Sequence, residues 1–184
     1  LRRQRQMCIR DRSFAFDAQV TLAGGTPVYV PLSEEKKFAF DADEFEKRVT
    51  PRTKMIIMNT PHNPTGHVAT LIELEAVAEI AKRHNLLVLS DEVFENFVYR
   101  GRKHYSIASL PDMKERTITV NSLSKNFSMY SWRIGYLVAD KQLMRYLKTV
   151  HSWTVSFHAP LIQLAALAVL TGPREWIVTR VREY

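Results

Sequence analysis

Ser122, Ser124, Lys125 and Arg133 are the side chains of this sequence whose types and spacing best suit a chemical role. Lys125 stands in the run Ser-Leu-Ser-Lys at 122–125, one residue after the stretch 117–120, which is typical of a buried strand. A neutral lysine amine forms an imine with a carbonyl group, and hydroxyl and guanidinium groups donate hydrogen bonds to phosphate. The arrangement therefore indicates a site for a phosphate-bearing cofactor held covalently by Lys125.

Two other polar side chains follow predicted strands. Asp91 ends the run 86–90, where a carboxylate is partly buried and needs a partner such as a cationic ring nitrogen. Asn63 lies in the run 59–66, Asn-Thr-Pro-His-Asn-Pro-Thr-Gly, which is too rich in turn formers to continue a strand or a helix. Each has a purely structural alternative: Asp91 as a helix or turn cap, and the run 59–66 as an ordinary connecting turn.

Strands and helices alternate from residue 13 onward. Strands are predicted at residues 26–31, 54–59, 86–91, 117–122 and 134–139. Helices are predicted at residues 41–49, after Thr70, at 141–151, at 159–170 and after Pro173. This order predicts an α/β fold with a mostly parallel sheet flanked by helices. Ligands in such folds bind at the carboxyl ends of the strands, which is where Asn63, Asp91 and Lys125 fall.

The composition is that of one globular domain, with 184 residues of which 46% are hydrophobic and 24% charged. A single cysteine excludes an internal disulfide framework, and no apolar stretch is long enough to span a bilayer. No signal-peptide pattern is present, so a cytoplasmic protein without a membrane partner is expected. His62 and His67 flank a turn without acidic support and the other histidines are scattered, so no metal site is expected.

Residues 1–12 carry four of the seven net positive charges of the chain. The segment is a disordered basic arm, a nucleic-acid contact or not native. We favour a non-native origin, because the run Gln-Met-Cys-Ile-Arg-Asp-Arg resembles translated sequencing-adapter sequence, and we leave residues 1–12 out of the predicted fold. Only three net charges remain on residues 13–184, so no nucleic-acid partner is expected.

Three motifs, taken in order, resemble those of the class I/II aminotransferases, which are pyridoxal 5′-phosphate enzymes of fold type I. They are the run 59–66 quoted above, Ser-Asp-Glu-Val-Phe at 90–94, and Ser-Leu-Ser-Lys at 122–125 with Trp-Arg-Ile-Gly-Tyr at 132–136. The resemblance covers nearly all of residues 13–184. It implies that this segment is part of the large, cofactor-binding domain of such an enzyme, truncated at both ends.

The resemblance also implies roles for single residues. Lys125 would hold the cofactor as a Schiff base and act as the catalytic residue, and Asp91 would pair with the pyridine nitrogen. Asn63 would form a hydrogen bond with the ring 3′-oxygen, from a loop in which the bond before Pro64 can be cis. The cofactor phosphate would be bound by residues of the third motif, namely Ser122, Ser124 and Arg133.

Two positions depart from the family pattern. Phe94 stands where the family often has a tyrosine whose hydroxyl bonds the 3′-oxygen, so Asn63 would make that contact alone. Ser131 stands where a glycine is common, so its backbone must avoid a conformation that only glycine adopts. The arginine that binds the substrate carboxylate is expected outside this span.

The function that the resemblance implies is transfer of an amino group from an amino acid to a 2-oxo acid by a homodimeric enzyme. The run 150–157 and the Pro-His-Asn-Pro loop favour the kynurenine and methionine aminotransferase branch, with the aspartate and aromatic branch left open. A carbon–sulfur β-lyase on the same fold would use the same lysine, aspartate and arginine. A regulatory protein with a non-catalytic aminotransferase-like domain is a further alternative, as is a fragment that is inactive by itself.

Overall fold

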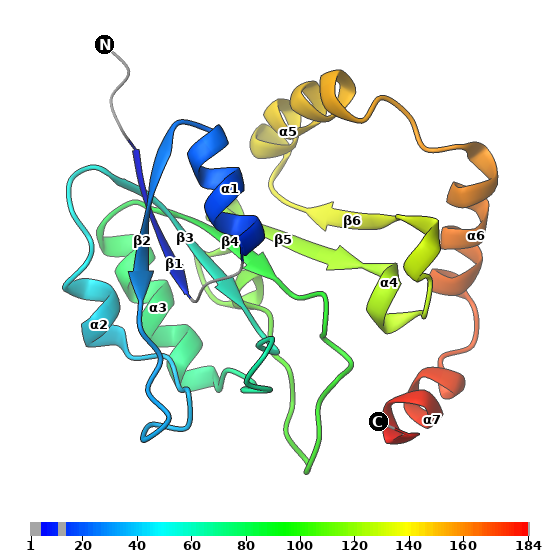
Figure 1. Ribbon diagram of the computed structural model, residues 1–184, viewed down its shortest axis with the longest axis horizontal. Helices are drawn as coiled ribbons and strands as arrows, with labels where there is room; N and C mark the ends of the chain where they lie inside the picture. The colour runs from blue at the N-terminus through cyan, green and yellow to red at the C-terminus, as the bar shows by residue number, and fades with distance from the viewer. Residues whose placement is uncertain (1–4, 11–13, 184) are drawn as a thin grey trace.

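A computed structural model of the chain describes residues 5–10 and 14–183, and it contains one sheet flanked by helices (Figure 1). The six strands lie in the order β2-β1-β3-β4-β5-β6. Their bounds are Arg5–Arg10 for β1, Gly25–Val30 for β2, Thr53–Asn59 for β3, Leu87–Asp91 for β4, Thr117–Ser122 for β5 and Gly135–Val138 for β6. The first five strands are parallel and β6 is antiparallel to β5. The predicted α/β fold with a mostly parallel sheet is therefore confirmed.

Seven α-helices connect and extend the strands in the described part of the chain. They are α1 (Phe14–Leu22), α2 (Ala42–Glu46), α3 (Leu71–Arg83), α4 (Leu123–Asn126), α5 (Lys141–Thr154), α6 (Pro160–Thr171) and α7 (Glu175–Glu183). Three short 3-10 turns lie at Ile107–Ser109, Lys114–Arg116 and Tyr130–Trp132. All five predicted strands are present, with each bound within one residue of its predicted position.

The two faces of the sheet pack against different helices. On one face Ile56 and Val88 belong to the main core, together with Leu74 and Val77 of α3. On the other face Ile57 packs against Val20 of α1. Side chains alternate along a strand, so consecutive residues within β3, and likewise within β4, point to opposite faces of the sheet.

Helix starts follow the predicted capping signals. Thr70 and Glu73 form a reciprocal capping box at the start of α3, and Asp41 caps α2 by accepting hydrogen bonds from the N–H groups of Asp43 and Glu44. Helix α2 ends at Glu46, three residues earlier than predicted, because the chain turns there toward β3.

The N-terminal segment differs from its sequence-based interpretation. Residues Arg5–Arg10 form β1 and pair in parallel with both β2 and β3, whereas we had placed residues 1–12 outside the fold. The physical reason for this difference lies in the backbone. Because β2 and β3 are not neighbours, the N–H and C=O groups on their facing edges need hydrogen-bond partners, and β1 supplies them from between the two strands. The non-native origin of residues 1–12 stays a prediction.

The chain after β6 runs through α5, α6 and α7 as an arc beside the sheet (Figure 1). A second core cluster forms there, in which Leu123, Phe127 and Met129 pack with Ile177 and Val181 of α7. In the described residues no single helix is long and apolar enough to cross a membrane, although α6 and α7, which are bent by 89° relative to each other, would together be long and apolar enough.

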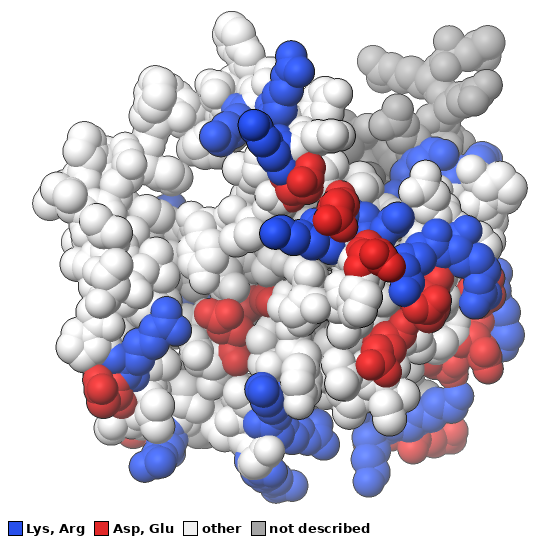
Figure 2. All heavy atoms as spheres, turned by 180° about the vertical axis from the view of Figure 1, so that it is seen from behind, with Lys and Arg blue, Asp and Glu red and all other residues white. Residues whose placement is uncertain are grey.

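Charged side chains are distributed unevenly over the surface. Figure 2 shows basic and acidic side chains interleaved over most of one face, whereas the part beside α6 is largely uncharged. Large apolar side chains are exposed along α5, α6 and their connection, among them Tyr146, Val150, Trp153, Phe157, Leu161 and Leu164. The described chain thus leaves an apolar face uncovered on the side of α5 and α6.

Candidate active site

The carboxyl ends of three neighbouring strands meet at one edge of the sheet. Asn59 at the end of β3 is in register with Asp91 at the end of β4, and Asp91 is in register with Val120 of β5. Strand β5 ends two residues later, at Ser122. The sequence-predicted residues that follow these strands therefore lie along a common edge, as expected for ligand-binding residues in a parallel sheet.

Asp91 is a partly buried carboxylate on the α1 side of the sheet. Its Oδ1 accepts a hydrogen bond from the Val93 N–H at 3.2 Å, and in the described part of the chain no lysine or arginine pairs with it. Burial raises the pKa of Asp91, and the charge of Glu92 acts in the same direction. A carboxylate in this state has a strong electrostatic preference for a cation placed beside it.

The Asn63 loop is tied to the end of β4. The side-chain oxygen of Asn59 accepts a hydrogen bond from the Asn63 N–H at 2.8 Å, and its amide nitrogen donates to the Asp91 carbonyl at 3.0 Å. The Thr60 N–H donates to that same carbonyl at 3.0 Å. The bond before Pro64 is cis, as the sequence suggested, and the Thr60–Pro61 bond is cis as well. Asn63 itself is exposed at the sheet edge.

Helix α4 begins directly at the end of β5 and presents Lys125. Ser122 is its N-cap, since the Ser122 hydroxyl accepts a hydrogen bond from the Ser124 N–H at 3.1 Å. The Leu123 N–H donates to the carbonyl of Ile134, which anchors this turn to the segment before β6. Ser124 is buried, whereas Ser122 and Lys125 are half-buried.

The Lys125 ammonium lies between two aromatic rings. Its Nζ is 4.9 Å from the centre of the Tyr130 ring and 5.9 Å from that of Phe94. Both distances are within the range of cation–π attraction. The sequence had drawn attention to Phe94 only as a missing hydroxyl, and Tyr130 was not among the predicted site residues. Its only signal in the sequence was a large aromatic residue five positions after Lys125.

Arg133 lies near the end of β5, on the same side as Lys125, because it precedes β6 in the β5–β6 hairpin. In that hairpin Ser122 is in register with Gly135. Arg133 has a left-handed backbone (φ 51°, ψ 45°) and an exposed side chain that donates to the Tyr130 carbonyl at 3.3 Å. In the described chain no contact joins its guanidinium to the hydroxyls of Ser122 or Ser124. Ser131 lies in the 3-10 turn Tyr130–Trp132 and avoids the left-handed region, as expected; Ser128 has a positive φ instead.

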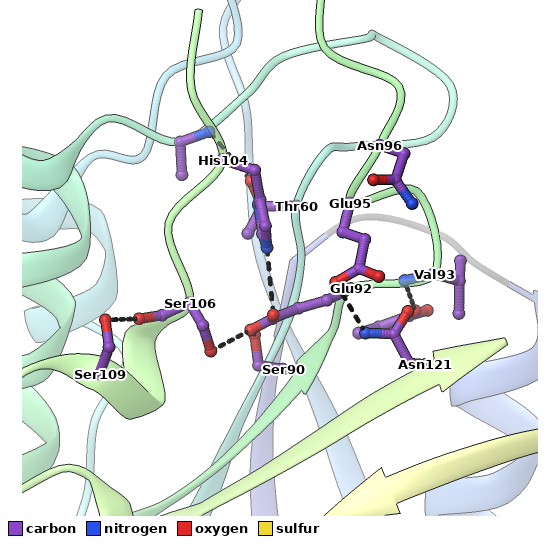
Figure 3. A network of polar contacts seen from close by, with 12 residues as sticks. Thr60, Ser90, Glu92, Val93, Glu95, Asn96, His104, Ser106, Ser109 and Asn121 are labelled. Carbon is purple, nitrogen blue, oxygen red and sulfur yellow. Dashed lines mark hydrogen bonds and ion pairs between the residues drawn. The ribbon is translucent and has the colours of Figure 1, made fainter. Parts of the chain in front are cut away.

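A polar network that the sequence did not predict lies directly under this edge (Figure 3). Glu92 accepts hydrogen bonds from Ser90, Ser106 and His104. Beside it, the Asn121 amide donates to Glu95 at 3.2 Å, and burial raises the pKa of Glu95.

A further bond connects the network to the helix that carries Lys125: the Asn126 amide donates to Asn121 at 3.3 Å. Glu92 was visible in the sequence only as the neighbour of Asp91. Its partner His104 is twelve positions away and gives no pattern that sequence reasoning could use.

The groups at this edge fit pyridoxal 5′-phosphate by their chemistry. Asp91 is an unpaired, partly buried anion that suits a pyridinium N–H, and Lys125 is an amine in reach of solvent that suits an aldehyde. The N-terminal turn of α4 and the Arg133 guanidinium supply donors for a phosphate.

Comparison with known proteins gives one consistent family. The sequence model of the family "Aminotransferase class I and II" matches residues 13–183. The aromatic-amino-acid aminotransferase 2 of Thermococcus litoralis is 48% identical over 157 residues, which are 85% of this chain and 40% of the relative. The aspartate aminotransferase of Pyrococcus abyssi is 46% identical over the same shares of both chains.

Solved structures agree with this result. The crystal structure of the aromatic aminotransferase from Pyrococcus horikoshii OT3 superimposes with a TM-score of 0.92 at 40% identity, covering 100% of this chain and 48% of that one. The chain thus spans less than half the length of each of these three proteins.

The predicted branch receives less support than the alternative that was left open. The kynurenine–oxoglutarate transaminase 1 of Mus musculus is 39% identical over 163 residues, which cover 83% of this chain and 38% of the relative. Both relatives named above, from the aspartate and aromatic branch, have higher identities.

Proposed function

Because this chain belongs to the class I and II aminotransferase family, we propose that its protein transfers an amino group from an amino acid to a 2-oxo acid, using pyridoxal 5′-phosphate bound as a Schiff base on Lys125. The observation that carries the proposal is the presence, at one sheet edge, of a carboxylate that no lysine or arginine of the described residues pairs with (Asp91) and of an accessible amine (Lys125). We further propose that residues 13–184 are part of the cofactor-binding domain of this enzyme.

Asp91 would bind the protonated ring nitrogen of the cofactor. When bound, pyridoxal 5′-phosphate supplies an electron-accepting ring that stabilises negative charge at the substrate Cα. Asp91 would keep the ring nitrogen charged by pairing with it, and the same pairing would relieve the cost of a buried, unpartnered carboxylate. Asn63, held by Asn59 at the same edge, would orient the ring through its 3′-oxygen.

Lys125 would move the proton of the reaction. Its amine, when free, would accept the proton from the substrate Cα at Nζ and release it again. The rings of Phe94 and Tyr130 would hold the amine in position while it carries the charge. Ser122, Ser124 and Arg133 would fix the cofactor phosphate beside it.

We also propose that the full-length protein is a homodimer. The proposal is supported by the apolar face along α5 and α6, where Trp153 is 87% and Phe157 is 90% exposed. Contiguous apolar surface of this kind is typical of a region covered by further chain or by a second subunit.

The test is a transamination assay on the full-length protein that contains this chain. Aromatic amino acids, aspartate and kynurenine are the first donors to supply, since the relatives carry these names. We expect one 2-oxo acid to form from the donor for every acceptor converted to its amino acid. Release of pyruvate and a thiol from a sulfur-containing amino acid, with no acceptor converted, would contradict the proposal and identify a β-lyase.

A further inference from the structure

Glu92 is a charged group that the proposed mechanism does not use, although it directly follows Asp91. Its residue is only 2% exposed, and its carboxylate is bonded on both oxygens. Oε1 accepts hydrogen bonds from the hydroxyls of Ser90 and Ser106, each at 2.8 Å, and Oε2 lies 3.1 Å from Nε2 of His104. Figure 3 shows these three side chains converging on Glu92 from two different segments.

The contacts of Glu92 fix the backbone on either side of Asp91. The Glu92 N–H donates to the Val120 carbonyl at 2.9 Å, which continues the β4–β5 pairing one residue past Asp91. On the other edge, the Asp91 carbonyl accepts hydrogen bonds from Asn59 and Thr60 of the neighbouring strand end. Because consecutive side chains of a strand point to opposite faces, anchoring Glu92 on the α3 side directs Asp91 to the α1 side.

Glu92 also closes the long excursion between β4 and the turn Ile107–Ser109. The chain leaves the sheet after Glu92, reaches an exposed tip at residues 99–103, and returns at His104 and Ser106, which both bind Glu92. Phe94 lies at the start of this excursion and faces the Lys125 ammonium. The hydrogen bonds of Glu92 therefore hold both ends of the segment that carries Phe94.

We propose that Glu92, held by Ser90, Ser106 and His104, is a positioning residue that aims Asp91 at the ring nitrogen of the cofactor and Phe94 at Lys125. The inference rests on the proposed function, because it presupposes that the cofactor binds at this edge. A buried carboxylate is a weak device for stability alone, since its lost hydration offsets much of the attraction it gains. Its three fixed hydrogen bonds do impose one geometry on two segments at once.

The test compares Glu92→Gln with Glu46→Gln in the full-length protein. Glu46 forms the matched control, a second Glu–His pair (2.7 Å to His84 Nε2) that joins α2 to the end of α3, away from the carboxyl ends of the strands. The readouts are the dissociation constant of pyridoxal 5′-phosphate and the circular dichroism that the protein induces in the bound cofactor. Both report on cofactor placement, and neither depends on turnover.

We expect Glu92→Gln to bind the cofactor about tenfold more weakly, the scale of one lost charge-assisted hydrogen bond, and to diminish the induced signal. Glu46→Gln should leave both readouts at the wild-type value. Since Glu92 acts through Asp91, adding Glu92→Gln to Asp91→Asn should weaken binding less than Glu92→Gln does alone.

Two results would overturn the inference while leaving the proposed function intact: a Glu92→Gln protein that matches wild type in both readouts, or losses that add fully to those of Asp91→Asn. A wild-type protein that binds no pyridoxal 5′-phosphate would instead overturn the proposed function, and this inference with it.

Discussion

Asp91 and Glu92 are adjacent acidic residues that the fold treats differently. Among the described residues, Glu92 has three hydrogen-bond donors around its carboxylate, whereas Asp91 has only the Val93 N–H. Burial raises the pKa of Asp91 above its ordinary value of 3.8, so the folded chain binds its proton more tightly than the unfolded chain does. By linkage, the stability associated with Asp91 is highest at low pH and is lost as the pH rises through the folded pKa.

The variant Asp91→Asn is therefore expected to stabilise the cofactor-free protein at pH 7, by about 0.5–2 kcal/mol, while weakening cofactor binding. Denaturant unfolding at pH 7 and at pH 3.5 measures this, and the gain should shrink at the lower pH, where Asp91 takes up its proton. A variant less stable than wild type at pH 7 would show that Asp91 has a favourable partner in the cofactor-free state.

At the residue scale, the sequence predicted where the site residues lie in the fold better than it predicted which residues contact them. Asn63, Asp91, Ser122 and Lys125 were placed at strand ends from patterns of neighbouring residues, and they do lie along one edge. The contacts that the sequence missed join residues far apart in the chain, such as those of Glu92 with His104. Periodicity and turn chemistry report only on near neighbours, so such pairs leave no local signal.

Helix α3 starts with a capping box whose acidic residue, Glu73, also accepts hydrogen bonds from His67 and from the Phe40 N–H outside the helix. Burial by itself would raise the pKa of Glu73, but hydrogen bonds from His67, Thr70 and the Phe40 N–H lower it to about 2. Since the folded pKa is below the ordinary 4.5, the stability from Glu73 is fully present above that value and is lost as the pH falls toward about 2.

We expect Glu73→Gln to lower the free energy of unfolding by about 2 kcal/mol at pH 7, the range for hydrogen bonds to a charged group, because the neutral amide loses the charge that His67, Thr70 and the Phe40 N–H stabilise. The exposed Glu75 of the same helix is the matched control, and Glu75→Gln should change stability by less than about 0.5 kcal/mol. Urea titrations at pH 7 and pH 2.5 measure both, and the difference between wild type and Glu73→Gln should narrow at the lower pH. If the stability difference between wild type and Glu73→Gln is the same at both pH values, the pKa of Glu73 is not lowered in the folded protein.

Strand β6 needs a glycine where it meets β5. A Cβ on Gly135 would lie 2.5 Å from the Asn121 carbonyl oxygen, a backbone atom that cannot move aside without disturbing the pairing. Gly135→Ala is expected to destabilise the protein by about 1–3 kcal/mol through this overlap. Val138→Ala, on the exposed end of the same strand, is the control, and denaturant unfolding compares the two. Equal effects would show that β6 adapts to the added methyl group.

At the element scale, the sequence located strands and capped helices and missed β1 and α1. The five predicted strands are bounded by turns or capping residues that are visible locally. Helix α1 has no comparable signal, and its position is defined by the contact of Val20 with Ile57 across the sheet. Strand β1 was left out of the predicted fold because its sequence resembles translated sequencing-adapter sequence, although the structure places it between β2 and β3 and pairs it with both.

At the scale of the whole molecule, the apolar face along α5 and α6 is the part that the described chain leaves uncovered. A cavity of about 440 Å³ opens beside it, lined by residues of β6 and α5 such as Tyr136 and Met144. We expect the 184-residue chain alone to bind a hydrophobic dye strongly and the full-length protein to bind it weakly. Dye fluorescence measures this, and equal binding per chain would contradict the interpretation of a covered face.

A pair of substitutions locates that binding. Trp153→Ser combined with Phe157→Ser should remove most of the dye signal of the isolated chain, because both side chains are almost fully exposed. Ile72→Ser is the control, since Ile72 is 78% exposed on α3, away from this face. A signal lost equally in both proteins would place the dye elsewhere.

The central claim is that Lys125 holds pyridoxal 5′-phosphate, and borohydride reduction of the full-length protein tests it most directly. Reduction converts an imine between lysine and cofactor into a stable amine, which peptide mass spectrometry can assign to one residue. We predict a visible absorbance band that disappears on reduction, with the added mass on Lys125. The band should be absent in Lys125→Ala and retained in Lys114→Ala, an exposed lysine before β5. A full-length protein without the band, or with the cofactor mass on another lysine, would contradict the account.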